Sequence, residues 1–178
     1  YTGEDTLSLH DALPIYGAEY AYTVPAYKNL GASGVIAETI PREFCTETNT
    51  TAPTASGTLF LQAIYLTAGQ LVSNISISSA TTAANSPTNY FFALYSAARA
   101  LLAVSANQTT TAWAANTYKT LAMTTPYRVP VSGLYYIGFM MTATTIVTTK
   151  GNTAKTGGQL AGQAPILHGA SSTGLTTA

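Results

Sequence analysis

The feature that most limits the fold of this chain is a series of short apolar and β-prone segments separated by turn residues. From position 57 onward these segments recur about every 10 to 15 residues, a spacing typical of short strands joined by turns. The segments are 59–67, 71–79, 90–95, 101–105, 118–123, 134–142 and, more weakly, 145–149. They are rich in β-branched and aromatic residues, which favour strands. The sequence therefore predicts an all-β fold, an antiparallel β-sandwich of jelly-roll-like form, with an irregular N-terminal leader.

Segment 71–79 alternates between apolar and polar residues, so each class is expected to occupy one face of a strand. The apolar face is expected to hold Leu71, Ile75 and Ile77. The polar face is expected to hold Asn74, Ser76 and Ser78.

Segment 97–106 is the one that resists a strand assignment. Its Ala- and Leu-rich composition also favours a helix. We prefer a hairpin in which 90–95 and 101–105 are joined by a turn over 96–99, because strand-forming residues flank the turn on both sides.

The chain is expected to have three parts. Residues 57–178 form the sandwich domain, residues 16–56 a stalk- or linker-like segment, and residues 1–15 a leader. Within the middle part, 35–40 is expected to form one short strand before Pro41. The run 46–56 is rich in Thr, Asn, Pro and Ala without periodicity, which predicts a loop.

The leader contains TLSLHDALPI at 6–15, which resembles the in-frame translation of a common short-read sequencing adapter. The alternative is a natural amphipathic helical turn capped by Ser8 or Asp5. We treat 1–15 as foreign sequence and exclude it from fold reasoning. The chain is then expected to be a metagenomic fragment, and His10 and Asp11 are not candidates for a site.

Charge is scarce and unevenly placed. Seven basic and seven acidic side chains balance formally, and only 8% of residues are charged. The last carboxylate side chain is Glu47, so everything from Thr48 onward lacks the groups needed for acid–base pairs, carboxylate-oriented triads or oxygen-ligand metal sites. We therefore expect no enzyme and no cofactor. No segment reaches the roughly 18 apolar residues that a membrane-spanning helix needs.

Nucleic acid is not an expected partner either. A surface that follows a phosphate backbone needs several converging basic side chains. The basic residues after Thr48 are scattered singly along the chain, at Arg99, Lys119, Arg128, Lys150 and Lys155.

Cys45 is the only cysteine, so neither an intramolecular disulfide nor a cysteine metal cluster is possible. A cysteine nucleophile would need a histidine partner. His168 is the only histidine outside the leader and lies in a Gly-, Ser- and Thr-rich tail. We expect an unreactive thiol and a solvated imidazole.

The residues with some potential for ligand binding are aromatic. Trp113 lies near Asn107, Asn116 and Tyr118 in the sequence and could stack on a sugar ring, a neutral ligand that needs no charged partner. The alternative, which we prefer for Trp113, is a place in the core or at a sheet edge. The candidates for glycan stacking are therefore Trp113, Tyr118 and Tyr127.

Three stretches carry a resemblance to a known group of proteins. They are LYSAARALLAVSANQ at 94–108 followed by Trp113, LAMTTPY at 121–127, and GLYYIG at 133–138. Together they resemble the β-sandwich domains of tail- or fibre-associated structural proteins of tailed bacteriophages and prophages. The resemblance covers about 57–149.

This resemblance implies a non-enzymatic virion structural or host-adhesion role, in a homo-oligomer such as the trimer of many fibres, on a virion or otherwise extracellular. Two alternatives stay open: a carbohydrate-binding module of a secreted enzyme, and a bacterial surface adhesin domain. A cell-surface glycan is the expected ligand in an adhesive role. The tail from His168 resembles a loop that leads to a further strand, so we expect a truncated C-terminus that leaves 134–142 or its neighbour as an open edge.

Overall fold

The structure is a computed structural model of the chain and describes residues 34–41, 45–51, 55–151, 164–170 and 175–176. The leader 1–15 and residues 16–33 lie outside the described residues. The chain divides into two units, Tyr1–Glu38 and Thr39–Ala178. Of the first unit, residues 34–38 are described and form no strand. All strands of the described residues belong to the second unit.

The described part of the chain contains nine strands and no helix. The strands are β1 (Thr46–Thr51), β2 (Thr58–Leu66), β3 (Leu71–Ser78), β4 (Asn85–Ser96), β5 (Leu101–Val104), β6 (Tyr118–Arg128), β7 (Gly133–Thr145), β8 (Thr149–Gly151) and β9 (His168–Ala170). The predicted all-β fold is thus confirmed.

Four antiparallel strand pairs are nested inside one another. β1 pairs with β8, β2 with β7, β3 with β6, and β4 with β5. Each pair encloses the next along the chain, as in one long hairpin rolled up on itself. Eight strands paired in this way form a jelly roll, and β9 is the one described strand outside the set.

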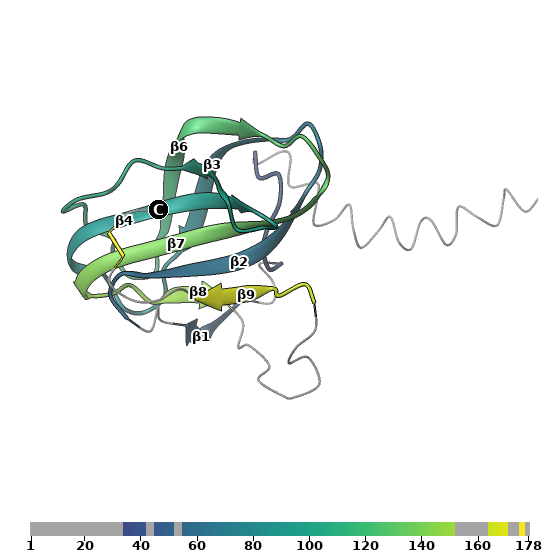
Figure 1. Cartoon of the computed structure of the whole chain (residues 1–178). Helices are drawn as coiled ribbons and strands as arrows, with labels where there is room; N and C mark the ends of the chain where they lie inside the picture. The colour runs from purple at the N-terminus through teal and green to yellow at the C-terminus, as the bar shows by residue number, and fades with distance from the viewer. Residues whose placement is uncertain (1–33, 42–44, 52–54, 152–163, 171–174, 177–178) are drawn as a thin grey trace, which may run out of the picture. The chain divides into compact units, whose positions relative to one another are not determined.

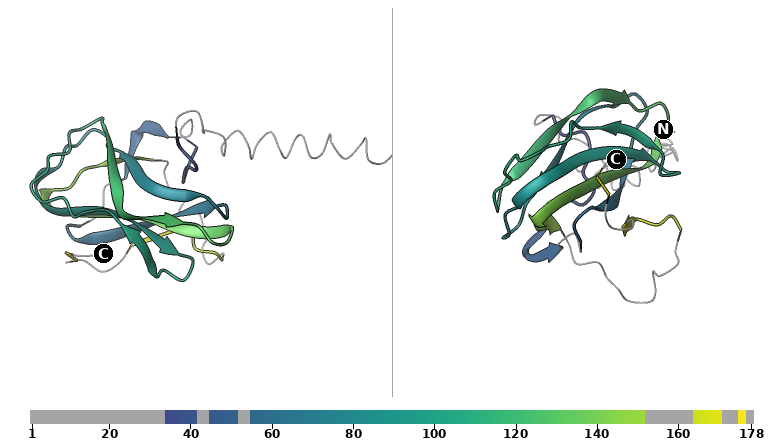
Figure 2. Two further views of the ribbon diagram at one scale, coloured as in Figure 1. Left: turned by 90° about the horizontal axis from the view of Figure 1, so that it is seen from above. Right: turned by 60° about the vertical axis from the view of Figure 1, so that its left-hand side comes forward.

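The strands form two layers. One sheet has the order β5-β4-β7-β2-β9. The other layer contains β3 with β6 and β1 with β8, and the two pairs are linked by a bridge between Ser79 and Thr149 and by the Ala80 N–H, which donates to the Thr148 carbonyl at 2.7 Å. Figure 1 shows β4, β7 and β2 side by side, with β9 outside β2. In the right-hand view of Figure 2, β4 and β7 curve together across the molecule.

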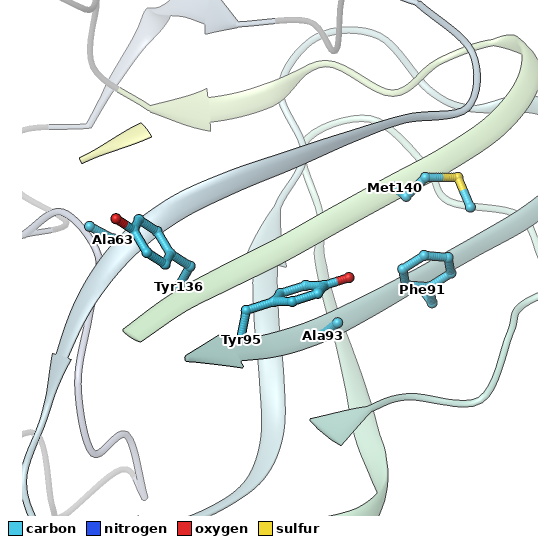
Figure 3. Close-up of a cluster of buried hydrophobic side chains, with 6 residues drawn as sticks. All are labelled: Ala63, Phe91, Ala93, Tyr95, Tyr136 and Met140. Carbon is cyan, nitrogen blue, oxygen red and sulfur yellow. The ribbon is translucent and has the colours of Figure 1, made fainter. Parts of the chain in front are cut away.

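The centre of the five-stranded sheet is apolar on both faces. In β4, the six residues 90–95 are all buried, although successive side chains of a strand point to opposite faces. Tyr90 faces the β3–β6 layer, since Lys119 Nζ of β6 lies 6.0 Å from the centre of its ring, and we call this the inner side. Phe92 and Leu94 share this face by the alternation of the strand. Phe91, Ala93 and Tyr95 point to the outer side, where Figure 3 shows them with Met140 and Tyr136 of β7 and Ala63 of β2.

On the inner side, Trp113 from the β5–β6 connection packs among three aromatic rings. Its ring centroid lies 5.7 Å from that of Phe92 and 5.6 Å from that of Phe139, both edge to face, and 6.0 Å from that of Tyr90. Edge-to-face contacts at this distance are favourable and hold the rings in fixed positions. The inner core is completed from the opposite layer by Val72, Ile75, Leu121 and Met123.

On the outer side, Leu175 packs against the buried cluster. Its backbone is held by two hydrogen bonds: its N–H donates to the Gly57 carbonyl at 2.8 Å, and Thr142 Oγ1 donates to its carbonyl at 3.2 Å. An apolar side chain from the C-terminal segment therefore helps to cover the outer face.

Two predictions for the N-terminal part are wrong. Residues 35–40 form no strand, and β1 begins where we predicted the loop 46–56. The run 46–51 has no apolar periodicity to mark it as a strand. Residues 46–51 form a strand because their backbone pairs with β8, and β-branched Thr is compatible with a strand conformation.

The predicted faces of β3 need one correction. Ile75 is buried as expected, but Leu71 is exposed and Val72 is buried in its place. The register shifts between Val72 and Asn74, where β6 carries extra residues including Pro126. This irregularity reverses the alternation at the start of β3, and it lets β6 continue to Arg128 instead of ending at Met123 as predicted.

The hairpin assignment of 90–105 is confirmed and the helical alternative is excluded. The Ser96 N–H donates to the Ala100 carbonyl at 2.8 Å, and Arg99 has a φ of 65°, which closes the turn between β4 and β5. Residues 134–142 are not an open edge, because β7 lies in the sheet between β4 and β2. The neighbouring strand β2 lies next to the edge instead, and β9, from the tail that was expected to lead to a further strand, pairs with part of it.

Gly138 of β7 provides a test of the outer face. A Cβ at this position would lie 2.6 Å from Tyr95 Cε2 and 3.2 Å from Leu59 Cδ1, and the Tyr95 ring is buried. We predict that Gly138→Ala lowers the free energy of unfolding by about 1–3 kcal/mol, the usual cost of overpacking a core. Denaturant unfolding measures it.

Gly133, in the same strand, is the matched control, because a Cβ there meets no atom within 4 Å. Gly133→Ala should leave the midpoint unchanged or raise it. Equal stability of the two variants would show that Tyr95 does not lie over Gly138.

Candidate functional site

The most distinctive surface of the described domain is the outward face of the β3–β6 pair. We call it the hydroxyl face, and it consists of Asn74, Ser76 and Ser78 from β3 and Tyr118, Thr120 and Ala122 from β6. The alternation in 71–79 predicted the three β3 residues on one face. Thr120 and Ala122 were missed, because the threonine-rich sequence gives no signal that distinguishes these positions from others.

The residues of this face lie directly opposite one another in three cross-strand pairs: Asn74 with Ala122, Ser76 with Thr120, and Ser78 with Tyr118. All three are non-hydrogen-bonded pairs, since the next pair along, Ser79 with Thr117, has its backbone hydrogen bond at 2.8 Å. Side chains approach most closely in such pairs. Accordingly, Ser76 Oγ and Thr120 Oγ1 are hydrogen-bonded at 2.7 Å.

The hydroxyl face carries no charged side chain. Lys119, which lies between Tyr118 and Thr120 in β6, points to the opposite side of the strand, where its Nζ donates to the Ala112 carbonyl at 2.9 Å and lies 6.0 Å from the centre of the Tyr90 ring. Hydroxyl and amide groups can donate and accept hydrogen bonds without selecting for ions. A ligand suited to this face is therefore polar and neutral.

Trp113 lies in the inner core with 1% of its surface exposed. Its neighbours Phe92, Phe139 and Tyr90 cover the ring, so no face is accessible to a sugar. This position corresponds to the core alternative for Trp113. The side-chain amide of Asn107, which is near Trp113 in sequence, contacts another residue: its Nδ2 donates to Asn89 Oδ1 at 2.6 Å.

Tyr118 is 74% exposed at the start of β6, on the hydroxyl face beside Ser78. Tyr127 lies near the other end of β6, opposite Val72, and is half-buried. Nine residues of strand separate the two rings, roughly 30 Å. The structure therefore does not bring Trp113, Tyr118 and Tyr127 together, and of the three only Tyr118 offers an open ring.

The remaining candidates for chemistry are also separate. Cys45 precedes β1, which pairs with β8, whereas His168 begins β9, which pairs with β2 in the other sheet. Among the described residues no group of three His, Cys, Asp or Glu side chains is placed to hold a metal ion. The same residues contain no helix that is long and apolar enough to cross a membrane.

Two tyrosine hydroxyls are buried in the core without a hydrogen-bond partner, those of Tyr90 on the inner side and Tyr95 on the outer side. Burial raises the pKa of each phenol above its ordinary value of 10.0, because the phenolate would lose its hydration. These hydroxyls contribute no site, since neither reaches the surface.

Comparison of the chain with protein-family models, with curated proteins and with solved structures gives no match.

The buried hydroxyl of Tyr90 predicts an alkaline limit to stability. Its folded pKa is raised, so the folded state holds the proton more tightly, and the resulting stability is present below pH 10 and lost as pH rises beyond it. We predict that Tyr90→Phe matches or exceeds the native chain in stability at neutral pH, by up to about 1 kcal/mol, because an unpaired buried hydroxyl is removed. Its advantage should grow above about pH 10.

Tyr135→Phe is the control, because the Tyr135 hydroxyl does have a partner, the Val131 carbonyl at 2.8 Å. That variant should lose about 1 kcal/mol at neutral pH. Denaturant unfolding of both variants between about pH 7 and pH 11 measures the difference. A loss in Tyr90→Phe equal to that in Tyr135→Phe would contradict the unpaired state of Tyr90.

Proposed function

We propose that this chain is a non-enzymatic structural or host-adhesion domain of a virion, associated with the tail or fibre of a bacteriophage or prophage. The observation that carries the proposal is the nested strand pairing. The pairs β2·β7, β3·β6 and β4·β5 all lie within 57–149, the stretch that resembles tail- and fibre-associated proteins. Jelly rolls recur in viral capsid proteins but also in lectins and cupins, so the resemblance contributes the choice among them.

The non-catalytic part of the proposal rests on charge. No Asp or Glu side chain occurs after Glu47, whereas the jelly roll is built mainly from later residues. Acid–base pairs and carboxylate-oriented nucleophiles need those groups at short distances from one another. A building or binding role has no such requirement.

We also propose a homo-oligomer, a trimer as in many fibres, located on the virion or otherwise outside the cell. An uncharged surface of hydroxyl groups, such as the hydroxyl face of β3 and β6, interacts weakly with ions. It is therefore suited to contacts whose strength does not depend on salt.

The virion assignment predicts that the protein is found in particles. Antibodies raised against the purified chain should label the tail or fibre of virions from the source community in immunogold electron microscopy, and its peptides should co-purify with tail proteins. Terminase, capsid or tape-measure genes should lie beside its gene on an intact contig. A neighbourhood of secreted hydrolase genes, with no labelling of particles, would instead favour the carbohydrate-binding module.

A second candidate function, recognition of a neutral glycan, is favoured by Tyr118. Tyr118 is 74% exposed and lies at the end of an uncharged row of hydroxyl and amide groups on β3 and β6. Sugar rings present both apolar C–H faces, which suit an aromatic ring, and hydroxyls, which suit Ser76, Thr120 and Asn74. This function would serve a host-adhesion domain, a carbohydrate-binding module or a bacterial surface adhesin equally well.

For this second candidate, we predict that Tyr118→Ala weakens binding to any glycan that the native chain selects on an array by at least about tenfold, or 1.4 kcal/mol. The exposed side chain can be removed with little effect on folding. Tyr65→Ala is the control, because Tyr65 is 55% exposed but lies on β2 of the other sheet. Equal binding by the native chain and Tyr118→Ala would rule out the hydroxyl face as the glycan site.

A further inference from the structure

Strand β9 is an addition to a fold that is complete without it. The eight nested strands use every other described strand, and β9 pairs with β2 alone, through the register Phe60 to Ala170, Leu61 to Gly169 and Gln62 to His168. All side chains of 164–170 are exposed. The segment therefore contributes backbone pairing at the β2 edge and little core.

The contacts of the C-terminal segment involve mainly its backbone. The Ala63 N–H donates to the Leu167 carbonyl at 2.7 Å, and the Tyr136 hydroxyl donates to the Ile166 carbonyl at 2.6 Å. Among the described residues of this segment, Leu175 packs its side chain against the outer cluster. None of these contacts requires that the segment come from the same chain as β2.

The connection to this segment is long. Residues 152–167 separate β8 from β9, which is sixteen residues. Sixteen extended residues span up to about 53–58 Å. A domain of about 140 residues is roughly 40 Å across. The segment can thus reach the β2 edge of an adjacent copy.

We propose that β9 and Leu175 are exchanged between copies of this chain, so that β9 of one copy pairs with β2 of another and Leu175 covers the partner's outer face. The exchanged and closed forms make the same contacts, so the balance depends on concentration. A tethered strand competes for its own β2 edge at an effective concentration of about millimolar, and a longer tether lowers this concentration. Exchange is therefore expected where several copies of the chain are held close together at a high local concentration. This inference does not depend on the proposed function.

The geometry at β2 and β9 allows a direct test. Ala63 and Leu167 share a backbone hydrogen bond, so the neighbouring pair Gln62 and His168 is of the non-hydrogen-bonded kind. Its Cα atoms are expected about 4.5 Å apart, within the range that a disulfide bridges. With Cys45→Ser as background, the double variant Gln62→Cys/His168→Cys should form a disulfide within one chain in dilute solution.

The exchange itself is tested by mixing the two single variants, Gln62→Cys and His168→Cys, at about 1 mM and oxidising them, since this approaches the effective concentration of the tether. A disulfide-linked heterodimer is expected, in several-fold excess over either homodimer and decreasing on dilution. Electrophoresis without reductant measures it, and circular dichroism checks that each variant is folded.

The matched control is a mixture of Asn74→Cys and Ala122→Cys in the same background. This pair is exposed and also non-hydrogen-bonded, but it joins β3 to β6 within the nested set, so it should yield no heterodimer above random collision. If the β2–β9 mixture gives no more heterodimer than this control, the segment stays in its own chain and the proposal is overturned. If the double variant forms no disulfide, either within one chain or between chains, β9 does not pair with β2 and the proposal is overturned as well.

Discussion

The rest of the structure depends on a central sheet that is apolar on both faces. In β4 and β7 nearly every side chain from Tyr90 to Tyr95 and from Tyr135 to Met141 is buried, on whichever face it points. Such a sheet cannot leave either face in water. The β3–β6 layer and Trp113 cover the inner face, and Leu175 from the C-terminal segment packs on the outer face. Gly138 marks how closely this outer layer packs, since the Tyr95 ring occupies the space of a side chain.

Much of this arrangement could be predicted from sequence because strand periodicity and turn residues are local signals. The segments corresponding to β2, β3, β4, β5, β6 and β7, and the β4–β5 hairpin, were predicted from them. What failed depends on partners distant in the chain. β1 has a polar sequence and forms a strand because it pairs with β8. The side chain of Val72 is buried in place of Leu71 because β6 carries extra residues opposite the start of β3. For the site, the polar face of β3 was predictable, but the burial of Trp113 and the exposure of Tyr118 follow from tertiary packing.

The scarcity of charge affects how this fold protects its strand edges. Natural sheets prevent edge-to-edge association with short edge strands, charged residues, proline or bulges. β6, at the edge of its layer, has Lys119, Arg128, Pro126 and the irregular register. β5, at one edge of the other sheet, is only four residues long. β2 has none of these features: it is nine residues long and contains neither a charge nor a proline.

Among the described residues, β9 is the strand that covers the β2 edge. The protection spans only part of the strand, since β9 is three residues long and pairs with residues 60–62, with one further backbone bond at Ala63. A charged residue would protect the β2 edge without cover, but every residue of β2 except Tyr65 is buried or half-buried, and an unpaired charge there would lose part of its hydration. The same apolar sequence that builds the central sheet therefore leaves β2 dependent on a strand from outside the jelly roll, which explains why the C-terminal segment belongs to the folded domain.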